Sequence, residues 1–209
     1  MASRALSNIA LALSALVLLA AAAAGAYLGW LWMQRSATDS ASAAADSAAY
    51  AALGSDVALT DHNGNPLRLS DLHGEVVMLF FGYTHCPDIC PATLYSMAQA
   101  NALLKKDGGA LIGVLITVDP ARDSVERLRE YVTFFDPSFI GLTGSGEQLA
   151  QVARDFGAAF EKGEASAEGG YLMGHTTFGY LLDQQGKVVR LLQSSDSPEV
   201  IADAARALL

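Results

Sequence analysis

The stretch EVVMLFFGYTHCPDICPATL, Glu75 to Leu94, decides the fold. Its first part, Val76–Tyr83, is an almost continuous apolar run, which is typical of a β-strand buried on both faces. From Ala92 to about Lys105, apolar and polar residues alternate with the spacing of a helix. Cys86 and Cys90 therefore lie where a buried strand gives way to a helix, the kind of junction at which α/β sheets carry their sites.

Strands and helices continue to alternate beyond this unit, which indicates an α/β domain whose central sheet is covered by helices. Before it, two short strands flank a turn signal and predict an N-terminal hairpin extension. The chain ends in a hairpin and a closing helix, an order typical of the thioredoxin-like fold with a mixed sheet. We expect strands at 57–60, 67–69, 76–83, 110–118, 139–142, 178–183 and 188–192, and helices at 92–105, 124–135, 147–156 and 198–208, with a loop at 161–170.

The N-terminal residues have a different composition from the rest of the chain. No charge occurs from Ile9 to Met33, and a helix of that length would be about 37 Å long at about 1.5 Å per residue, enough to cross a bilayer. A cleaved signal peptide is the alternative, but the apolar run continues past the small-residue cleavage sites. We expect a membrane anchor at 1–35, a flexible Ala/Ser-rich linker at 36–50 and a folded domain at 51–209.

Charge restricts the partners and suggests an orientation. The formal net charge is −9, and the first 50 residues contribute none of it, because Arg4 and Arg35 balance Asp39 and Asp46. An acidic domain is a poor partner for nucleic acid. Arg4 and the amino terminus weakly favour a cytoplasmic N-terminus. The expectation is a single-pass protein of a bacterial inner membrane whose soluble domain faces the periplasm.

The chain has only two cysteines, four positions apart, and three roles compete for them. A structural disulfide closing so small a loop would add little, because a domain of this size has enough core without it. A redox dithiol is compatible with the pair, although thioredoxin-type pairs have two intervening residues rather than three. Two thiolates also suit Cu(I) or Zn(II), and either ion would require further ligands.

The proline after the second cysteine bears on the chemistry of that cysteine. Proline favours the first position of a helix, so Pro91 predicts a helix that starts there with Cys90 at its cap. The partial positive charge of a helix N-terminus stabilises a thiolate and is expected to lower the pKa of Cys90.

Four histidines are candidates for the missing ligand. His62 and His73 lie in a turn and a polar connection and are expected to be exposed loop residues. His85 adjoins Cys86, and neighbouring side chains of an extended segment point apart. His175 lies in GHTTFGYLLDQQGKV, which resembles the G-x-P-T-T-F-x-x-D-x-x-G-x-V segment of many thioredoxin-like proteins. There the histidine replaces a proline that packs against the cysteine motif, so His175 is predicted to face both thiols.

The chain resembles the SCO/SenC family of copper-handling assembly factors of cytochrome c oxidase. FGYTHCPDICP matches the C-x-x-x-C-P motif of the family, ITVDPARDSVERLREY resembles its D-P-x-R-D segment, and GLTG is similar to a further stretch. The likeness runs from about Ser55 to the C-terminus. One departure is Gly174, where the family often has an aspartate before the histidine. The resemblance implies one copper ion, Cu(I) or Cu(II), held by Cys86, Cys90 and His175.

Two functions follow from the resemblance. The first is a membrane-anchored metallochaperone that takes copper from a donor and delivers it to the CuA centre of oxidase subunit II. The second is an enzyme, a thiol–disulfide oxidoreductase that reduces the cysteines of that centre, with Cys86 as nucleophile and Cys90 as resolving thiol. A sensor acting through binding alone is a third option. The two main functions are distinguished by His175, since dithiol exchange does not require it.

Three charged residues follow the second buried strand. Asp119, Arg122 and Asp123 are predicted to form a local ion pair and a helix cap, with Asp123 as the capping residue. The alternative is that they belong to a docking surface beside the cysteine motif.

Overall fold

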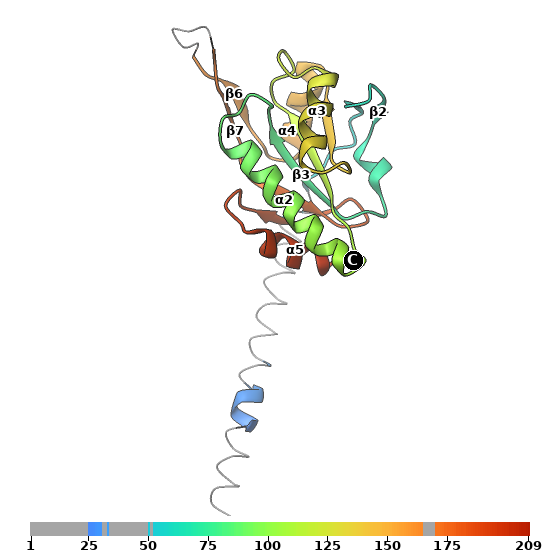
Figure 1. The fold of residues 1–209 in the computed structure, drawn as a ribbon, viewed down its shortest axis with the longest axis vertical. Coiled ribbons are helices and arrows are strands. Elements are labelled where there is room, and N and C mark those ends of the chain that lie inside the picture. Colours follow the sequence, from blue (N-terminus) through green and yellow to red (C-terminus); the bar gives the residue numbers. More distant parts are fainter. Residues whose placement is uncertain (1–24, 31–32, 34–49, 51, 165–169) are drawn as a thin grey trace, which may run out of the picture. The chain divides into compact units, whose positions relative to one another are not determined.

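The computed structural model describes residues 25–30, 33, 50, 52–164 and 170–209. Residues Ser47–Leu209 form one compact unit, which is shown with the rest of the chain in Figure 1. Most of the predicted anchor and linker lies outside the described residues, although residues 25–30 are helical. Among the described residues, no helix is long and apolar enough to cross a membrane. The anchor therefore stays a prediction.

The described residues of the domain form a seven-stranded mixed sheet with the order β2-β1-β5-β4-β3-β8-β9. The inner strand β3 pairs in parallel with β4 and antiparallel with β8, and β4 pairs in parallel with β5. β1 and β2 form the predicted N-terminal hairpin at one edge. The strands are β1 (Leu59–Asp61), β2 (Pro66–Leu67), β3 (Val77–Gly82), β4 (Ile112–Thr117), β5 (Ile140–Thr143), β8 (Gly179–Leu182) and β9 (Val188–Leu192).

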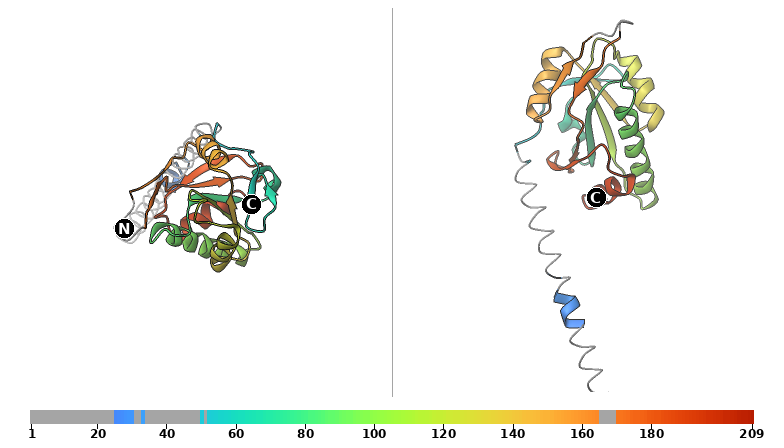
Figure 2. Two further views of the ribbon diagram at one scale, coloured as in Figure 1. Left: turned by 90° about the horizontal axis from the view of Figure 1, so that it is seen from above. Right: turned by 90° about the vertical axis from the view of Figure 1, so that its left-hand side faces the viewer.

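Helices cover both faces of this sheet, as Figure 2 shows. α4 lies on one face, and α2, α3 and α5 lie on the other, with α2 and α5 side by side (Figures 1 and 2). The helices are η1 (Leu69–Leu72), α2 (Ile89–Lys106), α3 (Val125–Phe135), α4 (Gly146–Asp155) and α5 (Pro198–Arg206). A mixed sheet between helices is the thioredoxin-like arrangement expected from the sequence.

The packing of the core explains why the sequence of β3 is a continuous apolar run. Every residue of β3 is buried, because α2 covers one of its faces and the aromatic cluster near α4 covers the other. Phe81 of β3, Phe156 and Tyr180 pack edge to face, with ring centroids 5.2–5.9 Å apart. Such pairs add to the free energy of area burial by about 0.5–1.5 kcal/mol each. The strand that leads to the cysteines is therefore held rigidly.

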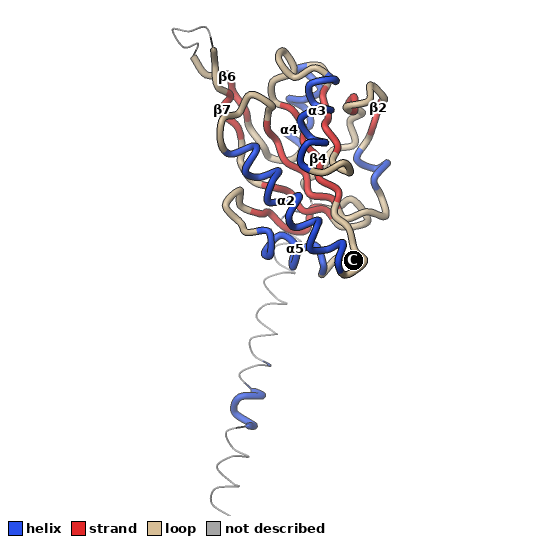
Figure 3. The backbone as a smooth tube through the Cα atoms, viewed as in Figure 1, coloured by secondary structure: helices blue, strands red, loops and turns tan. Residues whose placement is uncertain are grey.

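The start of α2 and the segment after α4 differ from expectation in ways that matter for the site. α2 begins at Ile89, so Cys90 lies inside its first turn rather than at the cap, and Asp88 is the N-cap. The expected loop at 161–170 begins as β6 (Phe160–Lys162), which pairs antiparallel with β7 (Met173–His175) in a separate two-stranded sheet. Figure 3 shows this pair beside the N-terminal end of α2. Neither strand has an apolar alternation long enough to be recognised in the sequence.

Candidate metal site

The structure brings together Cys86, Cys90 and His175, the three residues predicted as metal ligands. One ligand atom from each lies within 4.8 Å of the others. Cys86 comes from the bend after β3, Cys90 from the first turn of α2 and His175 from the end of β7. Three segments thus meet at one point, and β7 is distant in the sequence from the other two.

Cys90 is the buried member of the group, with no exposed surface. Its Sγ lies 3.5 Å from Nε2 of His175. Burial raises the pKa of the Cys90 thiol, and the backbone N–H of Tyr83 opposes that rise only in part. The expectation that the helix N-terminus would lower this pKa is wrong, because the pKa is raised and loss of hydration is the largest cause. Cys90 is therefore a neutral thiol until a positive charge arrives.

Cys86 is half-buried and offers the accessible sulfur. The backbone N–H of Cys90 points at Sγ of Cys86 at 3.5 Å. The backbone N–H of Cys86 donates to the carbonyl of Tyr83 at 3.3 Å. The first bond directs a donor from the start of α2 at the sulfur. Both cysteines are free thiols, with no bond between them.

The orientation of His175 settles which of its nitrogens can bind a metal. Its Nδ1 lies 2.9 Å from the carbonyl oxygen of Thr176. A carbonyl oxygen only accepts, so Nδ1 carries the proton, and Nε2 presents its lone pair toward Cys90. The rings of Phe80 and Tyr83 meet the imidazole edge on, at 5.9 and 5.8 Å between centroids. They hold the plane of the ring.

The backbone beneath Cys90 also leaves room for the sulfur. Gly82 ends β3, and a Cβ placed there would lie 3.0 Å from Sγ of Cys90 and 2.7 Å from the ring of Phe80. The site thus needs a residue without a side chain at this position.

This donor set fits copper better than a structural zinc. Two soft sulfurs and one imidazole match the preference of Cu(I), while structural zinc takes four ligands. Within the described part of the chain, no fourth cysteine, histidine or carboxylate joins the group. The group is accessible from Cys86 and His175, both half-buried, and closed at Cys90. An incomplete, accessible set of ligands allows exchange with a partner.

The other histidines do not contribute. His62 was expected to be exposed but is buried, because its Nδ1 accepts the backbone N–H of Gly141 in β5 at 3.0 Å. His73 is exposed, as expected. His85 points away from the thiols, with Nδ1 3.1 Å from Thr84 Oγ1 and 3.5 Å from Asp123.

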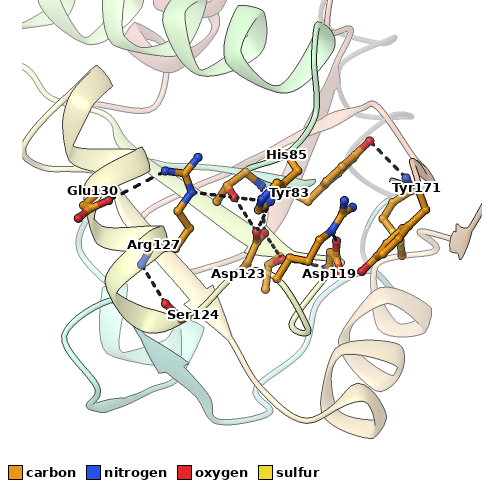
Figure 4. Close-up of polar contacts among 12 residues, drawn as sticks. Tyr83, His85, Asp119, Asp123, Ser124, Arg127, Glu130 and Tyr171 are labelled. Carbon is orange, nitrogen blue, oxygen red and sulfur yellow. Dashed lines mark hydrogen bonds and ion pairs between the residues drawn. The ribbon is translucent and has the colours of Figure 1, made fainter. Parts of the chain in front are cut away.

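The charged residues after β4 form a buried network rather than a cap. Asp123 accepts bonds from the N–H and hydroxyl of Thr84 and from the hydroxyl of Thr117, at 2.6–3.0 Å. The helix cap is Ser124 instead, whose hydroxyl accepts the N–H of Arg127 at 3.2 Å. The prediction that Asp123 caps α3 is therefore wrong. Figure 4 shows the row from Arg127 through Asp123 to Asp119.

The predicted ion pair is present, and it includes residues that the sequence did not single out. Arg122 donates to Asp119, which is buried, and Tyr171 donates its hydroxyl to the same carboxylate at 2.8 Å. Tyr83 lies next to this group in Figure 4. Tyr171 follows a segment rich in glycine and charged residues, which has no periodic pattern that would have indicated a role for it.

The fold and the site define a class: thioredoxin-like proteins with a Cys-Cys-His group suited to a soft metal. The model of the SCO1/SenC family matches residues 45–209, and this chain belongs to that family.

Individual relatives agree with this assignment. The chain is 38% identical over 153 residues to the mitochondrial SCO2 homologue of Bos taurus, a match that covers 72% of this chain and 58% of the bovine protein. It is 35% identical over 152 residues to an SCO2-like protein of Rickettsia felis, covering 72% and 74% of the two chains. The structure of Arabidopsis thaliana ScoI with copper bound superposes with a TM-score of 0.70, at 35% identity, over 73% of this chain and 95% of that one.

Proposed function

We propose that this protein binds one copper ion through Cys86, Cys90 and His175 and passes it to the CuA centre of cytochrome c oxidase during assembly. The observation that carries the proposal is the convergence of two sulfurs and one deprotonated imidazole nitrogen within 4.8 Å. The copper bound to the Arabidopsis relative supports the identity of the metal. The family assignment supports the role in oxidase assembly.

The unequal burial of the three ligands suits transfer. Cys86 and His175 are half-buried and can meet a copper donor or the oxidase, while Cys90 is enclosed. The pKa of Cys90 is raised by burial, so a copper ion that binds Cys90 has to displace the thiol proton. Partners that supply their own thiolates can therefore take the metal from the accessible side, and Cys90 regains its proton.

The predicted location at a membrane would bring this site near the oxidase that is to receive the copper. An anchor at 1–35 and a linker at 36–50 would tether the domain to a bacterial inner membrane on the periplasmic side. The linker then raises the effective concentration of the domain near oxidase subunit II, which is itself membrane-bound. The bacterial relative from Rickettsia supports a bacterial setting.

A second candidate function is thiol–disulfide exchange, and the contact between the N–H of Cys90 and Sγ of Cys86 favours it. The Cys86 thiolate would attack a disulfide of the oxidase copper site and form a mixed disulfide. Cys90 would then form a bond to the sulfur of Cys86 and release the partner sulfur, which takes up the proton that Cys90 loses. The pair is oxidised by two electrons, and the partner disulfide is reduced to two thiols.

A copper titration tests the proposal and separates the two functions. The reduced full-length protein in detergent micelles would be titrated with Cu(I) against a competing chelator without oxygen, beside His175→Ala and Cys90→Ser. We expect one-to-one binding that weakens sharply in both variants. The exposed His73 supplies the matched control His73→Ala, which should bind as the parent does. Binding unchanged in His175→Ala would refute the copper function and leave dithiol exchange.

A further inference from the structure

The strand that carries His175 lies outside the main sheet. β7 pairs with β6 through only three residue pairs, Phe160 with His175, Glu161 with Gly174 and Lys162 with Met173. So short a ladder holds a strand weakly, and its position depends on the side chains around it. The tyrosine hydroxyl of Tyr83 supplies one such contact, since it accepts the backbone N–H of Met173 at 3.2 Å.

Tyr171 supplies a second attachment two residues before β7. The guanidinium of Arg122 lies 3.6 Å from the centre of its ring, and Nζ of Lys162 lies 3.9 Å from the same centre. Its hydroxyl donates to Oδ1 of the buried Asp119 at 2.8 Å. Cation–π contacts of this kind contribute more where water is excluded, and Arg122 is mostly buried.

These contacts continue to the imidazole of His175. Arg122 is held by its ion pair with Asp119 and lies 5.8 Å from the ring centre of Tyr83. Tyr83 in turn meets His175 edge to face, with centroids 5.8 Å apart and planes at 87°. Figure 4 shows Tyr83, Asp119 and Tyr171 side by side. One group of side chains therefore contacts both the start of β7 and the ring at its end.

We infer that Tyr171 is a positioning residue for the metal site: held by Arg122, Lys162 and Asp119, it fixes β7 where Nε2 of His175 faces Cys90. Tyr171 does not touch the metal ligands; it acts through the strand. The inference rests on the copper binding proposed above, and it assigns to the loop end of β7 a role in the affinity of the site.

Removal of Tyr171 should weaken copper binding through His175 alone. Residues that orient a ligand typically change metal affinity by about 10- to 100-fold, so we expect a loss of about 10-fold in Tyr171→Ala. Tyr171→Phe keeps the ring beside Arg122 and Lys162 and loses only the bond to Asp119, so a smaller loss in the same direction is expected.

A double-mutant cycle in the full-length reduced protein provides the test. Cu(I) affinity would be measured by chelator competition for the parent, Tyr171→Ala, His175→Ala and the double variant. A positioning role predicts that Tyr171→Ala costs affinity in the parent and nothing further once His175 is absent. Tyr95→Ala, which removes an exposed tyrosine of α2 outside this group, is the control and should leave affinity unchanged.

A copper-free measurement gives an independent readout. In the parent, nitrogen-15 NMR should show His175 as the single tautomer protonated at Nδ1, and Tyr171→Ala should mix the tautomers. Tyr171→Phe serves the same purpose if the alanine variant does not fold.

The outcomes separate this inference from the function on which it rests. If His175→Ala binds copper as the parent does, the proposed function fails. If His175→Ala weakens binding while Tyr171→Ala does not, the function stands and the inference is overturned. An equal loss from Tyr171→Ala with and without His175 also overturns the inference, because it indicates a general loss of stability.

Discussion

At the scale of single residues, the site depends on Gly82 as much as on its proposed ligands. The backbone of β3 passes so close to Cys90 that any side chain at Gly82 would displace the sulfur, the ring of Phe80 or the side chain of Leu115. The residues that surround this glycine are fully buried and close-packed, so they cannot relax freely. A residue with no chemistry of its own thus determines where a ligand lies.

Gly82→Ala is predicted to destabilise the fold and to weaken copper binding together. Overpacking of a buried site costs about 1–3 kcal/mol, and the displaced sulfur of Cys90 would no longer face His175. Urea unfolding and a Cu(I) titration would measure the two effects. Gly146→Ala is the matched control, since a Cβ there meets no atom within 4 Å. Unchanged affinity in Gly82→Ala would contradict the role assigned to this position.

A second prediction at the residue scale concerns the contribution of His62 to the pH dependence of stability. Burial lowers the pKa of His62, with Asp61 opposing and Arg129 adding to the shift. The unfolded chain therefore binds a proton more readily than the folded one. This contribution to stability is complete above about pH 6.5, the ordinary pKa of histidine, and is lost as the pH falls below it toward the folded-state pKa.

His62→Asn removes the titrating ring and keeps an acceptor for the N–H of Gly141. Urea unfolding at pH 7.5 and pH 5.5 should show a smaller decrease in stability for this variant than for the parent. His73→Asn, at an exposed position, should follow the parent. An equal decrease in all three proteins would mean that His62 does not contribute.

At the scale of elements, the two neighbouring residues that precede α3 have different roles. Ser124 caps the helix, while the carboxylate of Asp123 ties the bend before the cysteines to the end of β4 through Thr84 and Thr117. This network joins two strand ends at the side of the sheet where the site lies. It fixes the bend from which Cys86 projects.

Replacement of these neighbours should therefore have unequal effects. Ser124→Ala removes one cap and should cost about 1 kcal/mol. Asp123→Ala leaves three buried donors without an acceptor and should cost about 3 kcal/mol or more. Chemical denaturation measures both. Equal costs would restore the view that Asp123 acts only at the helix terminus.

At the scale of the whole molecule, the three proposed ligands come from three elements that must all be in place. We therefore expect copper bound at this point to stabilise the folded chain by mass action, since the unfolded chain does not bring the three together. At a free copper concentration 100 times the dissociation constant, the gain is about 2.7 kcal/mol.

The midpoint temperature of thermal unfolding of the reduced protein should accordingly rise with added Cu(I). It should return to its starting value when a strong chelator removes the metal. His175→Ala should show a smaller rise at the same copper concentration. An identical rise in this variant would contradict a site that spans α2 and β7.

Much of this was accessible from the sequence, because local patterns carry it. The apolar run of β3, the helical spacing after it and the closing hairpin predicted the thioredoxin-like fold, and the fold placed His175 opposite the cysteines. The ends of elements were less accessible. α2 starts at Ile89, two residues before Pro91, because tertiary contacts rather than proline preference set the first turn.

The sequence by itself determined the fold class, the pair of thiols and the histidine that faces them, since each depends on periodicity or on a motif. Only the tertiary structure decided the protonation of Cys90, the burial of His62 and the contacts of Tyr171. The reason is physical: hydration, packing and cation–π contacts depend on residues brought together from distant parts of the chain. Tyr171 and Arg122 are 49 positions apart, yet the ring and the guanidinium lie within 3.6 Å.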